Sequence, residues 1–386
     1  MMLVKEKSRC CGCTACKAVC PHDAIVMRRD VLGFPYPEIL EDRCTQCGLC
    51  EKVCDFVKAH EPAPSAEEVT LSVYAARNKD NAALAESQSG GAFTALSDVV
   101  LSGSGAIYGA AMNDDFTVSH TRAVTAAERD RLRGSKYVQS DMGEVFRQVR
   151  KDLSEGREVM FTGTPCQNAG LASYIPERLK EGLVLVDFIC HGVPSPAVWE
   201  DYVAYMGRKG SIDKVCFRDK TSGGWKVHNE TFRYSGGKTL TRETFKVLFY
   251  KNIMLRHSCA VCPYHLGERK ADITIADFWG IGEVMPEMDG DAGTSMVICH
   301  TEKGKALLDE AREKLNMIHV KLSGDFISRK NPNLFRPSRI YKDREIFEKE
   351  YAEKGFRHVA RKWGDMGWRY KAWQLKVLIR RLTGRR

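Results

Sequence analysis

The chain is organised by one stretch near its start, Cys10-Cys11-Gly12-Cys13-Thr14-Ala15-Cys16-Lys17-Ala18-Val19-Cys20-Pro21. A second copy follows as Cys44-Thr45-Gln46-Cys47-Gly48-Leu49-Cys50-Glu51-Lys52-Val53-Cys54. Each copy has the spacing C-x2-C-x2-C-x3-C, in which three cysteines bind one 4Fe-4S cube and the fourth binds the other. The runs predict two clusters, one held by Cys10, Cys13, Cys16 and Cys54 and one by Cys44, Cys47, Cys50 and Cys20.

Zinc is the main alternative for Cys-x-x-Cys pairs, but a zinc site uses four ligands with a longer gap between the pairs. Residues 5–57 resemble bacterial two-cluster ferredoxins, which implies a ferredoxin-like domain over residues 1–57. Two residues depart from the pattern. Cys11 has no place in either ligand set, and Asp55 stands where the second run usually has proline. We expect Asp55 to change the geometry of the loop rather than the ligation.

The chain has 386 residues, which is too long for a ferredoxin alone. The remainder, roughly 330 residues, is enough for one large domain or two smaller ones. We find no apolar run of ~18 residues and no secretory signal at the start, so we expect a cytoplasmic protein or one bound at a membrane surface. Fifteen cysteines in such a chain favour metal ligation over disulfides.

Residues 58–69 contain two prolines and no apolar periodicity, which predicts a linker. Residues 70–340 alternate apolar strands with helices, which predicts a mixed α/β domain with α+β elements. Apolar runs at 158–161 and 183–189 end in Gly-Thr-Pro-Cys and Cys-His-Gly loops. Because parallel strands present their carboxyl ends at one edge, Cys166 and Cys190 are expected to share that edge. The last strand is expected at 294–300, with a helix over 303–316.

Four cysteines outside the ferredoxin region lie in loops rich in glycine or proline: Cys166, Cys190, Cys259 and Cys262. Four thiolates suit either iron–sulfur or zinc, so they predict a third metal site without choosing the metal. His191 is an alternative ligand at this site. The Cys166 loop could instead hold a catalytic nucleophile at a helix N-terminus. The last two cysteines, Cys216 and Cys299, are in strand-like runs and are interpreted as small buried hydrophobic residues.

The segment Ser87-Gln88-Ser89-Gly90-Gly91-Ala92-Phe93-Thr94 is a glycine turn that opens an apolar helix running to about Leu101. Exposed N–H groups at such a helix start can bind a phosphate. By itself the pattern is also typical of an ordinary turn.

Six short motifs occur in one order along the larger domain. They are Ser-Gly-Gly-Ala-Phe-Thr at 89–94, Gly-Ser-Lys-Tyr-Val-Gln-Ser at 134–140, Gly-Thr-Pro-Cys-Gln at 163–167, Cys-His-Gly-Val-Pro-Ser at 190–195, Cys-x-x-Cys-Pro at 259–263 and Ala-Asp-Ile-Thr-Ile-Ala-Asp-Phe-Trp-Gly at 271–280. Together they resemble the coenzyme F420 hydrogenase/dehydrogenase beta-subunit family over about residues 70–340. The resemblance implies FAD and one further 4Fe-4S cluster, with Cys166, Cys190, Cys259 and Cys262 as its ligands.

The same resemblance implies a set of flavin-lining residues: Ser89, Gly90, Gly91, Thr94, Lys136, Tyr137, Gly163, Thr164, His191 and Gly192. Lys136 and His191 are the expected catalytic residues, as helpers of proton or hydride transfer. A phosphate or surface contact is the alternative role for Lys136.

Iron–sulfur clusters carry single electrons and a flavin can exchange a hydride, so one chain with both would connect the two kinds of chemistry. We therefore expect an oxidoreductase that passes electrons between a redox partner protein, the ferredoxin clusters, a third cluster, FAD and a small organic substrate. Whether that substrate is F420 is left open. The alternative function is an electron-transfer subunit with no substrate site of its own, and an oligomer is compatible with either.

Residues 341–386 are predicted to form a basic helical tail. Residues 356–386 hold ten Lys or Arg and one acid, which accounts for the whole formal net charge of +9, so we expect no nucleic-acid partner. An apolar stripe runs along the tail through Trp368, Ala372, Leu375, Ile379 and Leu382. Such a helix either binds a membrane surface or an acidic partner, or packs on its own domain.

Overall fold

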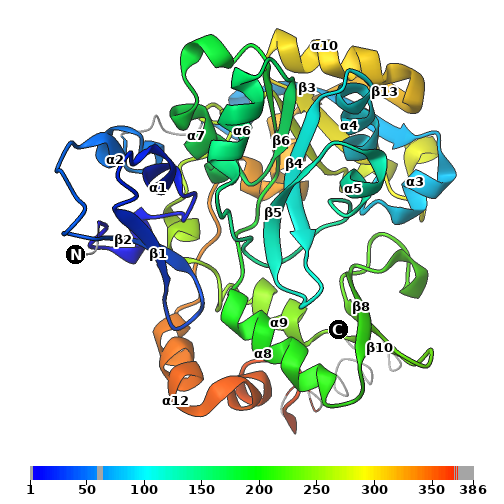
Figure 1. Cartoon of the computed structure of the whole chain (residues 1–386). Helices are drawn as coiled ribbons and strands as arrows, with labels where there is room; N and C mark the ends of the chain where they lie inside the picture. The colour runs from blue at the N-terminus through cyan, green and yellow to red at the C-terminus, as the bar shows by residue number, and fades with distance from the viewer. Residues whose placement is uncertain (1–2, 59–63, 369, 371, 373–386) are drawn as a thin grey trace.

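The computed structural model describes residues 3–58, 64–368, 370 and 372. Its N-terminal part contains two short helices that both begin after a residue in the left-handed conformation, Thr14 (φ 69°) and Gly48 (φ 73°). An antiparallel hairpin lies between them. This ferredoxin-type domain is the blue region at the left of Figure 1. Its elements are α1 (Ala15–Val19), β1 (Ile25–Arg29), β2 (Pro35–Ile39) and α2 (Leu49–Lys52).

The larger domain is built on an eight-stranded mixed sheet with the order β13-β3-β12-β11-β7-β6-β4-β5. The four neighbours β4, β6, β7 and β11 run parallel, whereas β5 at one end and β12, β3 and β13 at the other pair antiparallel. This confirms the mixed α/β expectation. The strands are β3 (Thr70–Asn78), β4 (Ala106–Met112), β5 (Val118–Ala123), β6 (Val159–Thr162), β7 (Leu183–Phe188), β11 (Ile273–Asp277), β12 (Ser295–Cys299) and β13 (Leu315–Ser323).

Helices cover the sheet on both faces. On one face, α4 and α10 bury Leu96, Val100 and Leu308 against the parallel strands. On the other, α6 and α7 bury Phe146 and Leu171. The helices of this layer are α3 (Asn81–Glu86), α4 (Ala92–Ser102), α5 (Ala126–Asp130), α6 (Val145–Ser154), α7 (Pro165–Tyr174), α10 (Glu302–Glu310) and α11 (Gly324–Lys330).

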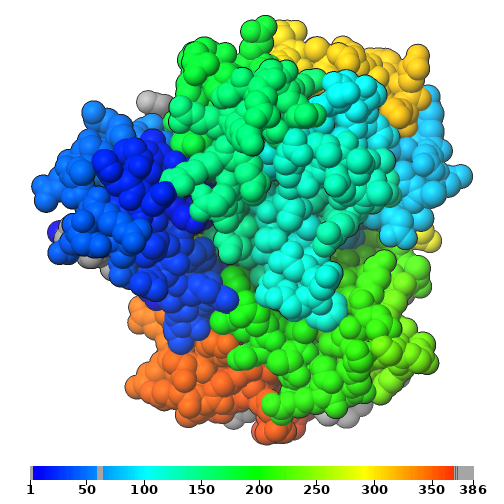
Figure 2. All heavy atoms as spheres, viewed as in Figure 1, coloured from blue at the N-terminus to red at the C-terminus, as the bar shows by residue number. Residues whose placement is uncertain are grey.

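A second layer packs a small antiparallel sheet with order β10-β9-β8 against three helices. Its core also takes in Leu32, Phe34 and Tyr36 from the β1–β2 hairpin, so the ferredoxin-type domain packs onto this layer directly. Figure 2 shows the blue domain in continuous contact with the rest of the molecule. The elements are α8 (Pro196–Gly207), β8 (Ile212–Phe217), β9 (Glu230–Tyr234), β10 (Thr239–Arg242), α9 (Thr244–Tyr250) and α12 (Arg344–Lys362).

The remaining regular segments are short 3-10 turns. They span Lys7–Arg9, Asp55–Val57, Ala66–Glu68, Glu177–Leu179, Lys220–Ser222, His257–Val261, Ile281–Glu283, Pro286–Met288, Ala311–Lys314 and Pro332–Leu334. Of the predicted linker, residues 59–63 lie outside the described part of the chain, and residues 64–69 contain the turn at Ala66–Glu68.

The predicted helix over 303–316 is wrong at its C-terminal end, and the strand at 294–300 is not the last one. The helix α10 ends at Glu310, and β13 follows at Leu315 and pairs with β3 along nine residues. Only Leu315 and Leu322 are buried in β13. Residues 318–323, Ile-His-Val-Lys-Leu-Ser, alternate apolar and polar side chains as a strand does, and the helix predicted up to residue 316 overlapped the first two residues of this strand.

The first part of the predicted tail forms helix α12, which packs into the core of the second layer. In α12, Phe347, Tyr351 and Val359 are buried in the core shared with α8 and α9. Of the apolar stripe, Trp368 is 75% exposed, and Leu375, Ile379 and Leu382 lie outside the described residues. In the part of the chain that the structure describes, no helix has the length and apolar character needed to cross a bilayer.

Candidate functional site

The thiols predicted to hold the first ferredoxin cluster lie near one another at the inner side of the domain. Burial raises the pKa of Cys16 well above its usual value, and the nearby thiols of Cys13, Cys10 and Cys54 add to the increase. Burial likewise raises the pKa of Cys54 to about 11, with Cys13 and Cys10 contributing. The C-x2-C-x2-C run and the distant Cys54 therefore meet in space.

The thiols predicted for the second cluster lie further out. Cys47 is exposed, and Cys20, Cys44 and Cys50 are half-buried. Burial raises the pKa of Cys50, while Glu51 and Cys47 nearby contribute to the increase. The second set thus stands closer to solvent than the first.

The four other predicted ligands line one small cavity of about 40 Å³: Cys166, Cys190, Cys259 and Cys262. Cys166 is in the first turn of α7, just after β6, and Cys190 follows the neighbouring parallel strand β7, as the strand order predicts. Burial raises the pKa of Cys190, and the other three thiols raise it further. Burial also raises the pKa of Cys259 to about 11.

Within the described residues, no group of three or more His, Cys, Asp or Glu side chains converges as the ligands of a single metal ion do. The four thiols instead surround a space. A 4Fe-4S cube requires this, because each thiolate binds a different iron atom at a corner of the cube.

Cys11 joins the two regions. Its side chain is buried (6% exposed) and lines the small cavity, although the residue belongs to the ferredoxin-type domain. It is hydrogen-bonded to Cys13 of the first ferredoxin set and to Cys166 of the third set, and these contacts raise its pKa well above the usual value. The hydrogen bond from Cys11 lowers the pKa of Cys166 to about 7. No motif in the sequence predicts this position of Cys11.

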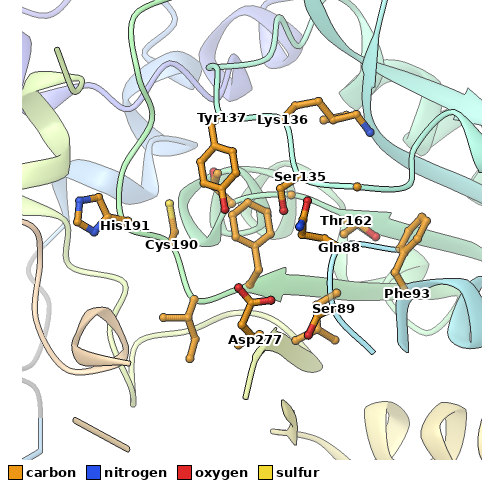
Figure 3. Close-up of a pocket in the computed structure, with 18 of the residues that line it drawn as sticks. Gln88, Ser89, Phe93, Ser135, Lys136, Tyr137, Thr162, Cys190, His191 and Asp277 are labelled. Atoms are coloured by element: carbon orange, nitrogen blue, oxygen red, sulfur yellow. The ribbon is translucent and has the colours of Figure 1, made fainter. Parts of the chain in front are cut away.

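A larger cavity of about 480 Å³ opens at the carboxyl edge of the parallel strands (Figure 3). Its wall brings together most of the predicted flavin-lining residues: Ser89, Gly91, Lys136, Tyr137, Gly163, Thr164, His191 and Gly192. The volume is within the usual range for small-molecule sites.

Two predicted residues are not on that wall. Gly90 lies between β3 and β12, where a Cβ atom would come within 2.1 Å of the Ala76 carbonyl oxygen and 2.4 Å of the Ser295 nitrogen. Thr94 is buried in α4, and its carbonyl oxygen accepts a hydrogen bond from Arg129. Close packing of the backbone therefore accounts for the glycine at position 90.

The cavity combines a helix start, cations and aromatic rings. Gly91, with φ 78°, is the residue before α4, so the first N–H groups of this helix lie at the cavity. The cationic side chains on the wall are Arg133, Lys136, Arg218 and Lys330. The aromatic ones are Phe93, Tyr137, Phe188, Phe249, Tyr250 and Trp279. Cations and a helix start suit phosphates, and aromatic rings suit a flat conjugated ring system.

Lys136 has its ammonium group bound to the chain itself. Its Nζ donates to the carbonyl oxygens of Arg131 (3.1 Å) and Arg133 (2.7 Å). Burial lowers its pKa to about 7. In Figure 3 the side chain extends to the side of the view opposite His191, so the two predicted catalytic residues are not brought together.

His191 lies between two amide oxygens. Its Nε2 is 2.6 Å from Asn252 Oδ1, and its Nδ1 is 3.2 Å from Asn333 Oδ1. The amides are oriented because Asn252 Nδ2 donates to the Arg339 carbonyl oxygen and Asn333 Nδ2 to that of Arg336. Both ring nitrogens therefore face amide oxygens, and these two contacts fix the orientation of the imidazole ring.

Sequence reasoning missed an ion pair on the same wall. Arg218 Nη1 donates to Asp277 Oδ2 at 2.5 Å and to the Tyr137 hydroxyl at 3.3 Å. Its guanidinium also lies 5.3 Å from the centre of the Trp279 ring. Arg218 follows β8 in a segment without any motif, so only the packing of the second layer against the sheet reveals it.

The two cavities share a wall. Cys190 faces the four-cysteine cavity and also the larger one, and so do Thr164, His191, Gly192, Val193 and Asn333. The ferredoxin-type domain reaches the small cavity through Cys11. The four-cysteine cavity therefore lies between the ferredoxin-type domain and the large cavity.

Comparison with known proteins gives matches to both regions. Residues 156–322 match the family described as the C terminus of the beta subunit of coenzyme F420 hydrogenase/dehydrogenase, and residues 9–57 match the 4Fe-4S dicluster domain. The F subunit of F420H2 dehydrogenase from Methanosarcina mazei is 27% identical over 190 residues, 46% of this chain and 51% of that protein. This chain therefore spans about half the length of that relative.

The B subunit of the Na+-translocating ferredoxin:NAD+ oxidoreductase complex of Acetobacterium woodii is 47% identical over 45 residues, which is 12% of each chain. Among solved structures, a chain of the F420-reducing [NiFe] hydrogenase complex from Methanosarcina barkeri aligns with a TM-score of 0.49 and 18% identity, over 80% of this chain and 98% of that one.

The cysteine runs, the mixed sheet and the sequence matches define the class as an iron–sulfur protein with a larger α/β domain. Residues 156–322 carry the C-terminal domain of the coenzyme F420 hydrogenase/dehydrogenase beta subunit, and residues 9–57 carry a 4Fe-4S dicluster domain.

Proposed function

We propose that this chain is a flavin- and iron–sulfur-dependent oxidoreductase. Electrons would pass between the two clusters of the dicluster domain, a third 4Fe-4S cluster and FAD, and a hydride would pass to or from an organic substrate at the large cavity. The observation that carries the proposal is the wall shared by the four-cysteine cavity and the large cavity, with Cys190 on both sides.

The four-cysteine site fits a cluster by the chemistry of its donors. Cys166, Cys190, Cys259 and Cys262 supply the thiolates that a 4Fe-4S cube requires. Arg269 also lines this cavity, and its buried Nε and Nη2 atoms have no hydrogen-bond partner among the described residues. Unused buried donors suit the sulfur atoms of a cluster, since buried N–H groups are otherwise satisfied.

The large cavity fits FAD by the chemistry of its wall. The start of α4 together with Arg133 would bind the pyrophosphate. Tyr137 and Trp279 would flank the flavin ring. When bound, the flavin would supply the exchange of a hydride with the substrate and of single electrons with the clusters.

The protein residues would orient this chemistry. His191, held between Asn252 and Asn333, would present a fixed imidazole ring at the boundary of the two cavities. The ion pair of Arg218 and Asp277 would fix the Tyr137 ring through the hydroxyl contact. Lys136 would brace the 131–136 loop, because its ammonium group donates to two carbonyl oxygens of that loop.

A cysteine pair tests the third cluster. Purified Cys259→Ser protein is expected to fall from about 12 to about 8 iron atoms per chain and to lose flavin reduction by the clusters. Cys299→Ser is the matched control, because Cys299 is a half-buried thiol in β12 outside both cavities. Unchanged iron content and flavin reduction in Cys259→Ser would overturn the third cluster.

An arginine pair tests the flavin site. Arg133→Gln removes a cation from the cavity wall, and we expect at least a fivefold weaker retention of FAD during purification. Arg131→Gln, two residues earlier and exposed, is expected to retain it. Equal FAD content in the two variants would contradict the assignment of Arg133.

The substrate and partner follow from the relatives only as proposals. One relative belongs to an F420H2 dehydrogenase, so reduced F420 is the first donor to test, beside reduced ferredoxin, with the flavin spectrum as the readout. If neither reduced F420 nor reduced ferredoxin lowers the flavin absorbance, and the protein turns over no artificial donor, the alternative function is preferred. In that function the chain is an electron-transfer subunit without its own substrate site. A separate redox subunit would then hold the substrate.

A further inference from the structure

Arg256 is a fully buried arginine where the ferredoxin-type domain meets the larger domain (0% exposed). It lies three residues before Cys259 and lines the four-cysteine cavity. It belongs to no sequence motif, and the proposed function has not used it.

Its guanidinium group is bound mainly to the first cysteine run. Arg256 Nε donates to the Cys10 carbonyl oxygen at 2.7 Å, and Nη2 lies 3.6 Å from the Cys10 sulfur. Nη2 also donates to the Pro35 carbonyl oxygen at 2.9 Å, and Nη1 to Gln139 Oε1 at 3.0 Å. The guanidinium carbon lies 4.2 Å from the centre of the Tyr36 ring.

The charge of Arg256 has no carboxylate beside it. Four arginines are buried in the described part of the chain, and three of them pair with a carboxylate: Arg129 with Asp98, Arg218 with Asp277, and Arg344 with Glu348. Arg256 forms no ion pair within the described residues, and its partners are carbonyl and amide oxygens and one sulfur. A buried charge without a counter-charge is unfavourable, so an anion is expected at this place.

A cluster bound by thiolates provides that anion, and its first predicted ligand is the sulfur that Arg256 contacts. We propose that Arg256 is the counter-charge of the cluster held by Cys10, Cys13, Cys16 and Cys54, and that it makes this cluster easier to reduce. Reduction adds one electron and no proton, so the cluster becomes more negative and the nearby cation stabilises the reduced form. Hydrogen bonds to sulfur and local charge are known determinants of cluster potential.

The test is a redox titration of the full-length holoprotein, followed by electron paramagnetic resonance. Removing the charge in Arg256→Gln should shift the potential of one cluster to a more negative value, so that its ratio of reduced to oxidised form falls at least tenfold at a fixed potential. A tenfold change equals about 59 mV for one electron. Arg256→Lys keeps the charge and should shift the same cluster less.

Arg129→Gln is the matched control, because it removes a buried arginine that contacts α4 and no cysteine. Its potentials should equal those of the wild type. Wild-type potentials in Arg256→Gln with full iron content would overturn the proposal. Loss of iron in both Arg256 variants would also overturn it, because the residue would then act in assembly and not on the potential.

This inference rests on the dicluster part of the proposed function and needs neither FAD nor the third cluster. The two outcomes are separable. If Cys259→Ser keeps all its iron, the third-cluster hypothesis is wrong. The role of Arg256 is then still decided by the cluster potential measured in Arg256→Gln.

Discussion

The two cysteine runs have the same spacing and different surroundings. The first run packs against the larger domain: Arg256 binds Cys10, and Cys11 reaches Cys166. The second run faces outward, with Cys47 exposed and Leu49 37% exposed. Two runs with the same cysteine spacing therefore differ in how far they are buried against the larger domain. Under the proposed function, the second cluster would lie nearer a redox partner protein, and the first would lie between it and the larger domain.

The largest effect should separate the two runs directly. Both Cys16→Ser and Cys47→Ser should lose about 4 iron atoms per chain. Cys16→Ser should also lower the thermal unfolding midpoint much more, because Cys16 packs against the core that includes Leu171 of α7, whereas Cys47 is exposed. Iron analysis and calorimetry measure both quantities. Equal midpoints in the two variants would show that the runs are equivalent after all.

The core beneath the first run should give the protein a pH-dependent stability. Burial raises the pKa of Glu230, in β9, to about 8 from 4.5, so the folded state keeps a proton that the unfolded state releases. Stability from this group is complete below pH 4.5 and is lost as pH rises toward 8, by at most about 5 kcal/mol.

Glu230→Gln imitates the protonated acid and should flatten this slope in denaturant unfolding measured from about pH 5 to about pH 8. Glu243→Gln, a partly exposed neighbour paired with Lys246, is the control and should keep the wild-type slope. If Glu230→Gln follows the wild-type curve, the carboxyl is ionised in the folded protein. Leu32 and Phe34 of the ferredoxin-type domain belong to the same core, and Cys10 of the first run packs against it. Loss of this core at high pH should therefore destabilise the first run as well.

A smaller effect is expected from the hydrogen bond between Tyr264 and Asp55. The Tyr264 hydroxyl donates to Asp55 Oδ2 at 3.0 Å, which connects the residue after Cys54 to the loop after Cys262. Tyr264→Phe should destabilise the protein by about 1–3 kcal/mol, because a buried acceptor loses a partner. Denaturant titration followed by circular dichroism measures this loss. A change in the free energy of unfolding below about 0.5 kcal/mol would show that the hydrogen bond does not stabilise the interface.

The smallest effect is expected from an ion pair just before the second cysteine run. Arg43 and Asp42 form an exposed pair with 3.9 Å between their charged atoms. Arg43→Ala should change stability by less than about 0.5 kcal/mol. The same titration provides the comparison with Tyr264→Phe. A loss as large as in that variant would mean that the second run is held as firmly as the first.

Much of the fold could be predicted because its signals are local. The parallel strands β6 and β7 are continuous apolar runs, and the loops after them carry Cys166 and Cys190. The structure confirms that these strands are parallel neighbours. The edge strand β13, which pairs with β3 along nine residues, was missed although residues 318–323 alternate apolar and polar side chains, because the predicted helix extended into its start.

The four cysteines outside the dicluster domain were predicted to lie together, and all four line one cavity, while their ligation of a metal stays a prediction. Gly90 was misplaced on the cavity wall because close packing and phosphate binding both call for glycine at a helix start. Asp55 was expected to affect only its loop, and the structure gives it a hydrogen bond to Tyr264 across the interface. No local pattern reports a contact between residues 209 positions apart.

The sequence by itself determined the two cysteine runs, the dicluster domain and the order of most strands and helices, because cysteine spacing and apolar periodicity act over short distances along the chain. Only the tertiary structure decided that Arg256 is buried against Cys10 without a carboxylate, that Cys11 lies between two ligand sets and that two cavities share Cys190. These facts depend on how two domains pack, and packing joins residues far apart in the chain whose types are common elsewhere.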